Sequence, residues 1–155
     1  MVQFNESGFQ FSFAAPWTHV QQWDKLPSFT EGLGRVQSTR AVDFIGLHGS
    51  DFYFVEVKSF REHRIENKKR VTSGTLAAEI ADKVRDTMAG LVWAMERGHD
   101  SAALAPLLRQ VFVGTSRCRV VFWLEEDRQP GPADRSVLGE AIKQRLRWLN
   151  PHVIV

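Results

Sequence analysis

The chain contains a single cysteine, Cys118, and no long apolar run. One cysteine excludes an intramolecular disulfide and a zinc site built from several thiolates, and it suits a reducing compartment. A membrane-spanning helix would need about 20 consecutive apolar residues. A secretory signal would need a basic segment followed by an apolar one, and the N-terminal sequence has neither. We therefore expect a cytoplasmic protein with no membrane contact.

Motifs for several other chemistries are also missing. No histidine pair has the spacing typical of metal ligands; the histidines are His19, His48, His63, His99 and His152. No glycine-rich phosphate loop of the Walker or Rossmann type is present, which argues against a nucleotide-driven motor. The formal net charge is only +2, so binding of nucleic acid would depend on a local basic cluster. With 155 residues, 43% of them hydrophobic, the chain predicts a single domain, 1–155, with one substantial core.

The chain does contain two short apolar runs, 41–47 and 52–60, which are joined through Gly49 and Ser50. A glycine–serine pair between two such runs predicts a β-hairpin with a two-residue turn, because glycine tolerates a positive φ. We therefore expect the two runs to be neighbouring antiparallel strands.

That turn decides which charged residues of the hairpin meet. If His48 faces Asp51, then Asp43 lies directly opposite Glu56, and Lys58 shares their face because side chains alternate along a strand. Opposed carboxylates repel, and burial in an apolar sheet makes each charge costly. The pair therefore predicts a bound cation, and Mg²⁺ suits it because Mg²⁺ takes oxygen ligands, usually with one or two carboxylates. The alternative is a structural ion pair with Lys58.

An Asp on one strand, followed by an acid-x-Lys triplet on the adjacent antiparallel strand, resembles the PD-(D/E)XK nuclease superfamily. Asp43 matches the first element and Glu56-Val57-Lys58 the second, although Val42 stands where the family pattern has proline. The resemblance implies a Mg²⁺- (or Mn²⁺-) dependent endonuclease-type phosphodiesterase acting on nucleic acid, with DNA expected. It implies Asp43, Glu56 and Lys58 as catalytic residues, and Asp43, Glu56 and the backbone carbonyl of Val57 as metal ligands. Lys58 would orient the attacking water or stabilise transition-state charge.

The resemblance also implies an α/β fold with a restriction-endonuclease-like α-β-β-β-α-β core, in which helices cover both faces of a mixed sheet. The hairpin agrees with cover on both faces, because both of its faces are apolar. One face carries Val42, Phe44, Tyr53, Val55 and Val57, and the face with the charges carries Ile45, Leu47, Phe52, Phe54 and Phe60. Sequence patterns predict a strand or an extended arm over 1–15, a helix over 17–26, a strand over 35–40, the hairpin over 41–60 and a helix over 75–97. They also predict a second strand pair, or one strand with a bulge, over 111–113 and 119–125, then a helix over 134–149 and an edge strand over 152–155.

Further site residues are implied by the family. An acid from the first helix often completes such sites, and Glu31 is the candidate, with Asp24 in reserve. The loop 61–70 leaves the predicted site directly and is rich in lysine and arginine, which suits contact with a nucleic-acid backbone. Its candidate phosphate-binding residues are Arg64, Lys68, Lys69 and Arg70. On the long helix Lys83 is a further candidate, and for each of these residues the alternative is a solvated surface charge.

Two other readings stay open. A catalytically lapsed nuclease fold could serve as a nucleic-acid-binding or protein-interaction module, although all three motif residues are present here. An unrelated α/β domain could use the hairpin charges structurally, and a register slip of one residue would separate Asp43 and Glu56. The Gln-x-x-x-Tyr pattern of the RecB-like branch is missing, so no branch is assigned. A homodimer is compatible with the sequence.

Overall fold

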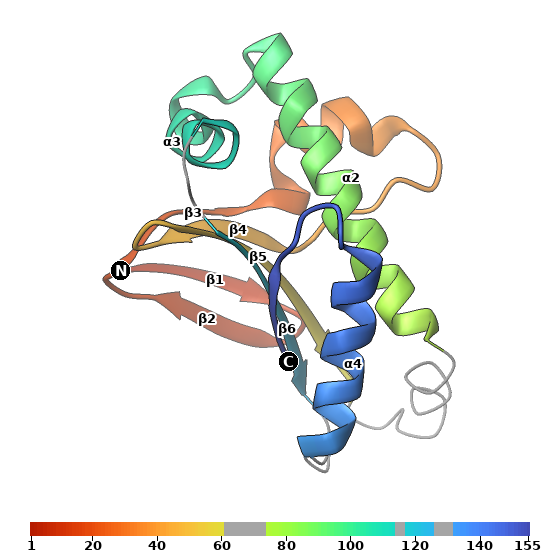
Figure 1. Ribbon diagram of the computed structural model, residues 1–155. Helices are drawn as coiled ribbons and strands as arrows, with labels where there is room; N and C mark the ends of the chain where they lie inside the picture. Colours follow the sequence, from red (N-terminus) through yellow and green to blue (C-terminus); the bar gives the residue numbers. More distant parts are fainter. Residues whose placement is uncertain (61–73, 114–116, 126–131) are drawn as a thin grey trace.

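The computed structural model describes residues 1–60, 74–113, 117–125 and 132–155. A mixed five-stranded sheet in the order β3-β4-β5-β6-β7 forms its centre (Figure 1). β4 is antiparallel to both of its neighbours, whereas β5, β6 and β7 are parallel. The strands are β1 (Val2–Glu6), β2 (Phe9–Phe13), β3 (Trp17–Gln22), β4 (Phe44–His48), β5 (Asp51–Ser59), β6 (Cys118–Glu125) and β7 (His152–Ile154). The helical elements are η1 (Trp23–Lys25), η2 (Ser28–Gly32), η3 (Leu33–Arg35), α2 (Thr75–Arg97), α3 (Ser101–Phe112) and α4 (Pro132–Arg145).

The β4–β5 hairpin has the register that its turn predicts. His48 pairs with Asp51, and Phe44 at the start of β4 pairs with Val55. Gly49 adopts φ +60° in the turn, a conformation that is costly for residues with a Cβ atom. The turn chemistry therefore agrees with the observed pairing of both strands. The ladder begins at Phe44, so the predicted pairing of Asp43 with Glu56 is not part of it.

The helices cover one face of the sheet. Apolar side chains of α2 recur at three- and four-residue steps and are fully buried; they include Leu76, Ile80, Val84 and Leu91. The sheet residues in the same cluster are Ile45, Leu47, Phe52, Phe54 and Phe60. α3 and α4 contribute Leu104, Leu107, Leu138 and Ile142 to this cluster. This face is the one on which the sequence places Glu56 and Lys58.

The opposite face is covered by the separate β1–β2 sheet (Figure 1). Phenylalanines at alternate positions of the two strands give that hairpin one apolar side; they are Phe4, Phe9, Phe11 and Phe13. They pack against Phe44, Val55 and Val57 of the central sheet. Within the described residues no helix contributes to this second cluster. The prediction of helices on both faces is therefore wrong, because an aromatic hairpin buries the second face.

The predicted division of the hairpin side chains between the two faces is confirmed with one exception. Val42 belongs to the helix-facing cluster and not to the other one. Residues 41–43 precede β4 and do not follow its alternation, and the backbone N–H of Val42 donates to Thr87 Oγ1 on α2 at 3.1 Å. The irregular segment therefore follows the helix instead of the sheet.

The segment before the hairpin differs from prediction. Residues 17–26 form β3 and η1 instead of a helix, and residues 35–40 contain no strand. A short half-apolar segment does not distinguish a helix from a strand by its pattern, so pairing with β4 decides the outcome. The first core strand is thus β3, and the helical turns η1, η2 and η3 lie between it and β4. The prediction of a mixed α/β architecture is confirmed, but the sheet begins with β3 where the restriction-endonuclease-like core would begin with a helix.

In the second half of the chain the predictions for α2, β6, α4 and β7 are confirmed, with shifted ends for β6, α4 and β7. The strand predicted over 111–113 is wrong, because residues up to Phe112 belong to α3. In the part of the chain that the structure describes, no helix combines the length and apolar character required to cross a bilayer.

Candidate functional site

Asp43 lies one residue before β4, at the edge where β3 ends. Its carbonyl accepts the backbone N–H of Trp23 at 2.9 Å, which extends the pairing of the two strands. Its Oδ2 accepts the backbone N–H of Val57 at 2.6 Å. A strand N–H points along the sheet toward the neighbouring strand, so this carboxylate continues the ladder in the plane of the sheet. Groups on both faces can therefore approach it.

Glu56 lies on the helix-facing side of β5, and its side chain is 1% exposed. Its Oε1 is 2.6 Å from Lys83 Nζ of α2 and 3.3 Å from Lys58 Nζ. Its Oε2 is buried and has no hydrogen-bond partner among the described residues. Burial and the nearby Asp43 carboxylate raise the pKa of Glu56 to about 7, against the opposing effect of the two lysines. Oε1 is thus paired with two ammonium groups, whereas Oε2 has no partner among the described residues.

Lys58 lies between two carboxylates. Its Nζ is 3.3 Å from Glu56 Oε1 and 3.1 Å from Glu79 Oε1 on α2. Burial acts to lower the pKa of Lys58, but Glu56 and Glu79 raise it above its ordinary value. The group is therefore a cation at neutral pH. It can stabilise negative charge but cannot act as a general base.

Glu6 reaches the same edge from the hairpin that covers the other face. Glu6 shares the sheet-facing side of β1 with Phe4, and it precedes a tight turn in which Ser7 (φ 51°) and Gly8 (φ 80°) both have positive φ. Its Oε2 accepts Gln22 Nε2 at 2.8 Å and contacts Lys25 Nζ at 3.2 Å. Burial acts to raise the pKa of Glu6, but Lys25 and these hydrogen bonds hold it below its usual value. Glu6 is therefore ionised at neutral pH.

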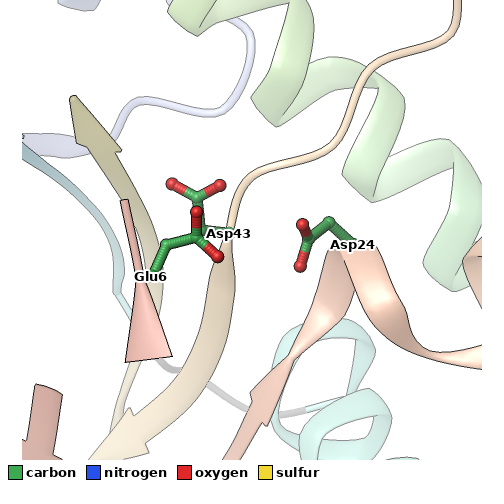
Figure 2. Close-up of side chains that lie close together, drawn as sticks. All are labelled: Glu6, Asp24 and Asp43. Carbon is green, nitrogen blue, oxygen red and sulfur yellow. The ribbon is translucent and has the colours of Figure 1, made fainter. Parts of the chain in front are cut away.

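Asp24, in η1, completes a cluster of three carboxylates with Glu6 and Asp43. One oxygen of each lies within 4.8 Å of one oxygen of the other two, and Figure 2 shows the three groups converging from separate segments. Burial, together with the charges of Asp43 and Glu6, raises the pKa of Asp24 to about 6. Its Oδ1 is buried and has no partner within the described part of the chain. Burial likewise raises the pKa of Asp43, although Lys83 and the N–H of Val57 oppose the shift.

The donor set suits a hard divalent cation. The candidate ligands are all oxygen atoms, from carboxylates and from the backbone carbonyl of Val57, and Mg²⁺ and Mn²⁺ prefer oxygen over nitrogen or sulfur. Two of these oxygens, Asp24 Oδ1 and Glu56 Oε2, are buried without partners. Unpaired buried acceptors cost free energy that a bound cation would recover. The residues at this edge therefore fit the kind of metal that the sequence predicts.

The structure brings some of the predicted residues together and separates another from them. Lys58 contacts Glu56, and the charge of Asp43 is near enough to Glu56 to raise its pKa. The three carboxylates that lie within 4.8 Å of one another are those of Asp43, Glu6 and the reserve candidate Asp24, and Glu56 is not in that group. Glu31 is exposed in η2 and does not belong to it either. Lys83 pairs with Glu56 and is only 15% exposed. Among the other predicted phosphate contacts, Arg64, Lys68, Lys69 and Arg70 lie outside the described residues.

Sequence reasoning missed Glu6 altogether. The alternating phenylalanines of 1–15 predict a strand or an extended arm, and the Ser7-Gly8 pair between them is an additional signal, for a turn. Such a pair between two alternating runs predicts a hairpin that has Glu6 next to its turn. The local structure of Glu6 was therefore accessible from sequence. Its contact with Asp43 was not, because it depends on how the hairpin packs on the sheet.

Known proteins give no independent guide to this site. No family model, no curated protein and no solved structure matches the chain. Its function must therefore be argued from the residues gathered at the edge of β4, and the resemblance to PD-(D/E)XK nucleases rests on the motif alone.

Proposed function

We propose that the protein is a metal-dependent nuclease that hydrolyses phosphodiester bonds, with DNA as the expected substrate. The observation that carries this proposal is the state of Glu56: it is 1% exposed, one of its oxygens has no partner among the described residues, and it lies beside Asp43 and Lys58. A structural ion pair gains nothing from an unpaired buried oxygen. A site that binds a cation requires one.

Mg²⁺ or Mn²⁺ would be held by Asp43 and Glu56, and the carboxylates of Glu6 and Asp24, which cluster with Asp43, would supply further oxygens. Bound there, the ion would polarise a phosphodiester and lower the pKa of a water molecule. The backbone carbonyl of Val57 stays a candidate ligand from the sequence. The N–H of the same residue already holds Asp43 Oδ2 in place at 2.6 Å.

The protein's own contribution to the reaction is electrostatic. Lys58 is a fixed cation beside Glu56, so it can stabilise the negative charge that develops on a phosphate oxygen or orient the attacking water. Glu79 holds the Lys58 ammonium at 3.1 Å and limits its movement. A positioned ammonium of this kind contributes more to the transition state than to substrate binding.

A non-catalytic module is the second candidate, and one observation favours it. Lys58 and Lys83 both contact Glu56 Oε1, and this arrangement joins α2 to β5 without any metal. A nucleic-acid-binding or protein-interaction domain could keep these ion pairs to hold α2 on β5. Such a domain would bind without cleaving, which separates the two candidates in one assay.

The decisive experiment is cleavage of supercoiled plasmid, linear DNA and single-stranded DNA or RNA with Mg²⁺ or Mn²⁺, with EDTA as the negative control. We expect metal-dependent cleavage by wild type, and a loss of at least about 100-fold in Glu56→Gln. Glu96→Gln is the matched control because Glu96 lies on the exposed side of α2. Absence of cleavage of every substrate, or equal cleavage by wild type and Glu56→Gln, would contradict the proposal.

A further inference from the structure

Lys83 points from the middle of α2 at the most deeply buried carboxylate of the site. Its Nζ lies 2.6 Å from Glu56 Oε1, closer than the 3.3 Å of Lys58, and its own side chain is 15% exposed. α2 presents Glu79 and Lys83 one turn apart, which matches the spacing of Lys58 and Glu56 along β5. α2 thus forms one ion pair with Lys58 and one with Glu56.

The two lysines are not equivalent. Lys58 shares its charge between Glu56 and Glu79, whereas Glu56 is the only carboxylate that Lys83 contacts in the described residues. An ammonium is a compact point charge that binds the same hard oxygen atoms as a divalent cation. Lys83 therefore compensates the negative charge of Glu56, as a bound metal ion would.

We propose that Lys83 is the built-in counter-ion of Glu56: it stabilises the site when no metal is bound, and it opposes a divalent cation there. The proposal rests on the proposed function, since it concerns the same metal site, and it assigns Lys83 the role of a counter-ion to Glu56 instead of a phosphate contact. The two buried carboxylate oxygens without partners, Glu56 Oε2 and Asp24 Oδ1, remain available for the metal. The charge of Lys83 then sets the metal concentration at which the site fills.

The electrostatic consequence has a definite sign. A positive charge a few ångströms from a bound divalent cation repels it, and the repulsion is strong where water is excluded. Removing that charge should therefore tighten metal binding. A lysine that only held Glu56 in the correct orientation would give the opposite result, because its loss would misplace a ligand.

The test is binding of Mn²⁺ to metal-free protein at pH 8, followed by the paramagnetic resonance of free Mn²⁺ and by calorimetry. We expect Lys83→Met to bind Mn²⁺ roughly tenfold more tightly than wild type, and Lys83→Arg, which keeps the charge, to bind like wild type. The metal-free Tm of Lys83→Met should fall, and Mn²⁺ should raise it by more than it raises the Tm of wild type. Lys143→Met is the control, because Lys143 is exposed on α4.

Unchanged or weaker Mn²⁺ binding by folded Lys83→Met would overturn the proposal. If that variant does not fold, Lys83→Gln decides in the same way, because it keeps a hydrogen-bond donor for Glu56 and removes only the charge. Cleavage by wild type together with unchanged Mn²⁺ affinity in the variant would reject the counter-ion role and leave the nuclease proposal standing. Tighter Mn²⁺ binding by the variant without any cleavage by wild type would support the counter-ion role and reject the nuclease proposal. Absence of Mn²⁺ binding by both wild type and variant would reject both proposals.

Discussion

The substitution Asp24→Asn should stabilise the metal-free protein, and the gain should depend on pH. Asp24 is partly buried beside Glu6 and Asp43, and its pKa is raised from 3.8 to about 6. A raised carboxyl pKa means that the folded protein prefers the protonated form. The folded state therefore loses stability as the pH rises from about 4 to 6, and the loss stays constant above that range. Asparagine carries no charge and escapes this cost.

The size of the gain follows from the same shift. A shift of about two pKa units corresponds to ~3 kcal/mol, and partial exposure of Asp24 to solvent reduces the expected gain to roughly 1 kcal/mol. For a domain of this size that is an increase in Tm of about 2–5 °C. The asparagine amide can also donate to a neighbouring carboxylate, which acts in the same direction.

The assay is thermal unfolding in EDTA between pH 4 and pH 8, followed by circular dichroism or calorimetry. We expect Asp24→Asn to melt higher than wild type at pH 8 and equal to it near pH 4. Glu31→Gln is the control, because Glu31 is exposed and does not belong to the acidic cluster. Its Tm should not differ from that of wild type in a pH-dependent way. Millimolar Mg²⁺ should raise the wild-type Tm more than that of Asp24→Asn, because the amide keeps an oxygen atom but lacks the negative charge of the carboxylate. A lower Tm for the variant at pH 8, or the same difference at every pH, would refute the reasoning.

Three further predictions concern catalysis, metal linkage and packing. Lys58→Met should lower kcat roughly 10²–10³-fold with little change in the affinity for DNA, measured by cleavage and by binding in Ca²⁺; near-normal kcat would remove the ammonium from the mechanism. Asp43→Asn should reduce the Mg²⁺-dependent rise in Tm while keeping an oxygen that can accept the Val57 N–H; an unchanged rise would exclude this residue as a ligand. Gly90→Ala should lower the Tm, because its Cβ would lie 2.8 Å from Cζ2 of the fully buried Trp23, and overpacking of ~1–3 kcal/mol exceeds the ~1 kcal/mol gained in helix propensity. Gly139→Ala, whose Cβ would have 3.6 Å of space, should raise the Tm, and equal effects at both glycines would contradict the packing argument.

Local features of the sequence determined the hairpin and the long helix. Gly49 in a tight turn fits the β4–β5 register, and the alternation of side chains along β5 places Glu56 and Lys58 on one face. The apolar periodicity over 75–97 identifies α2 at its observed bounds, with Gly98 at φ +65° after its end. Both features depend on interactions between residues that are close in the chain, which a sequence pattern records directly.

Tertiary structure decided what covers the second face and which strand begins the core. The segment 17–22 has no pattern that separates helix from strand, and its pairing with β4 made it β3. The phenylalanines of β1 and β2 could have packed on any apolar surface of the right size. They lie on the sheet because Phe44, Val55 and Val57 present a face that no described helix covers.

The acidic cluster also belongs to the tertiary structure. Asp43 could be chosen from its strand, but Glu6 and Asp24 meet it only because the β1–β2 turn and the end of β3 arrive at the same sheet edge. Lys83 could be placed on a polar stripe of α2, yet only the packing of that helix on the sheet brings its ammonium to Glu56. Charges from distant segments leave no periodic signal in the chain, because their spacing is set by packing and not by backbone geometry.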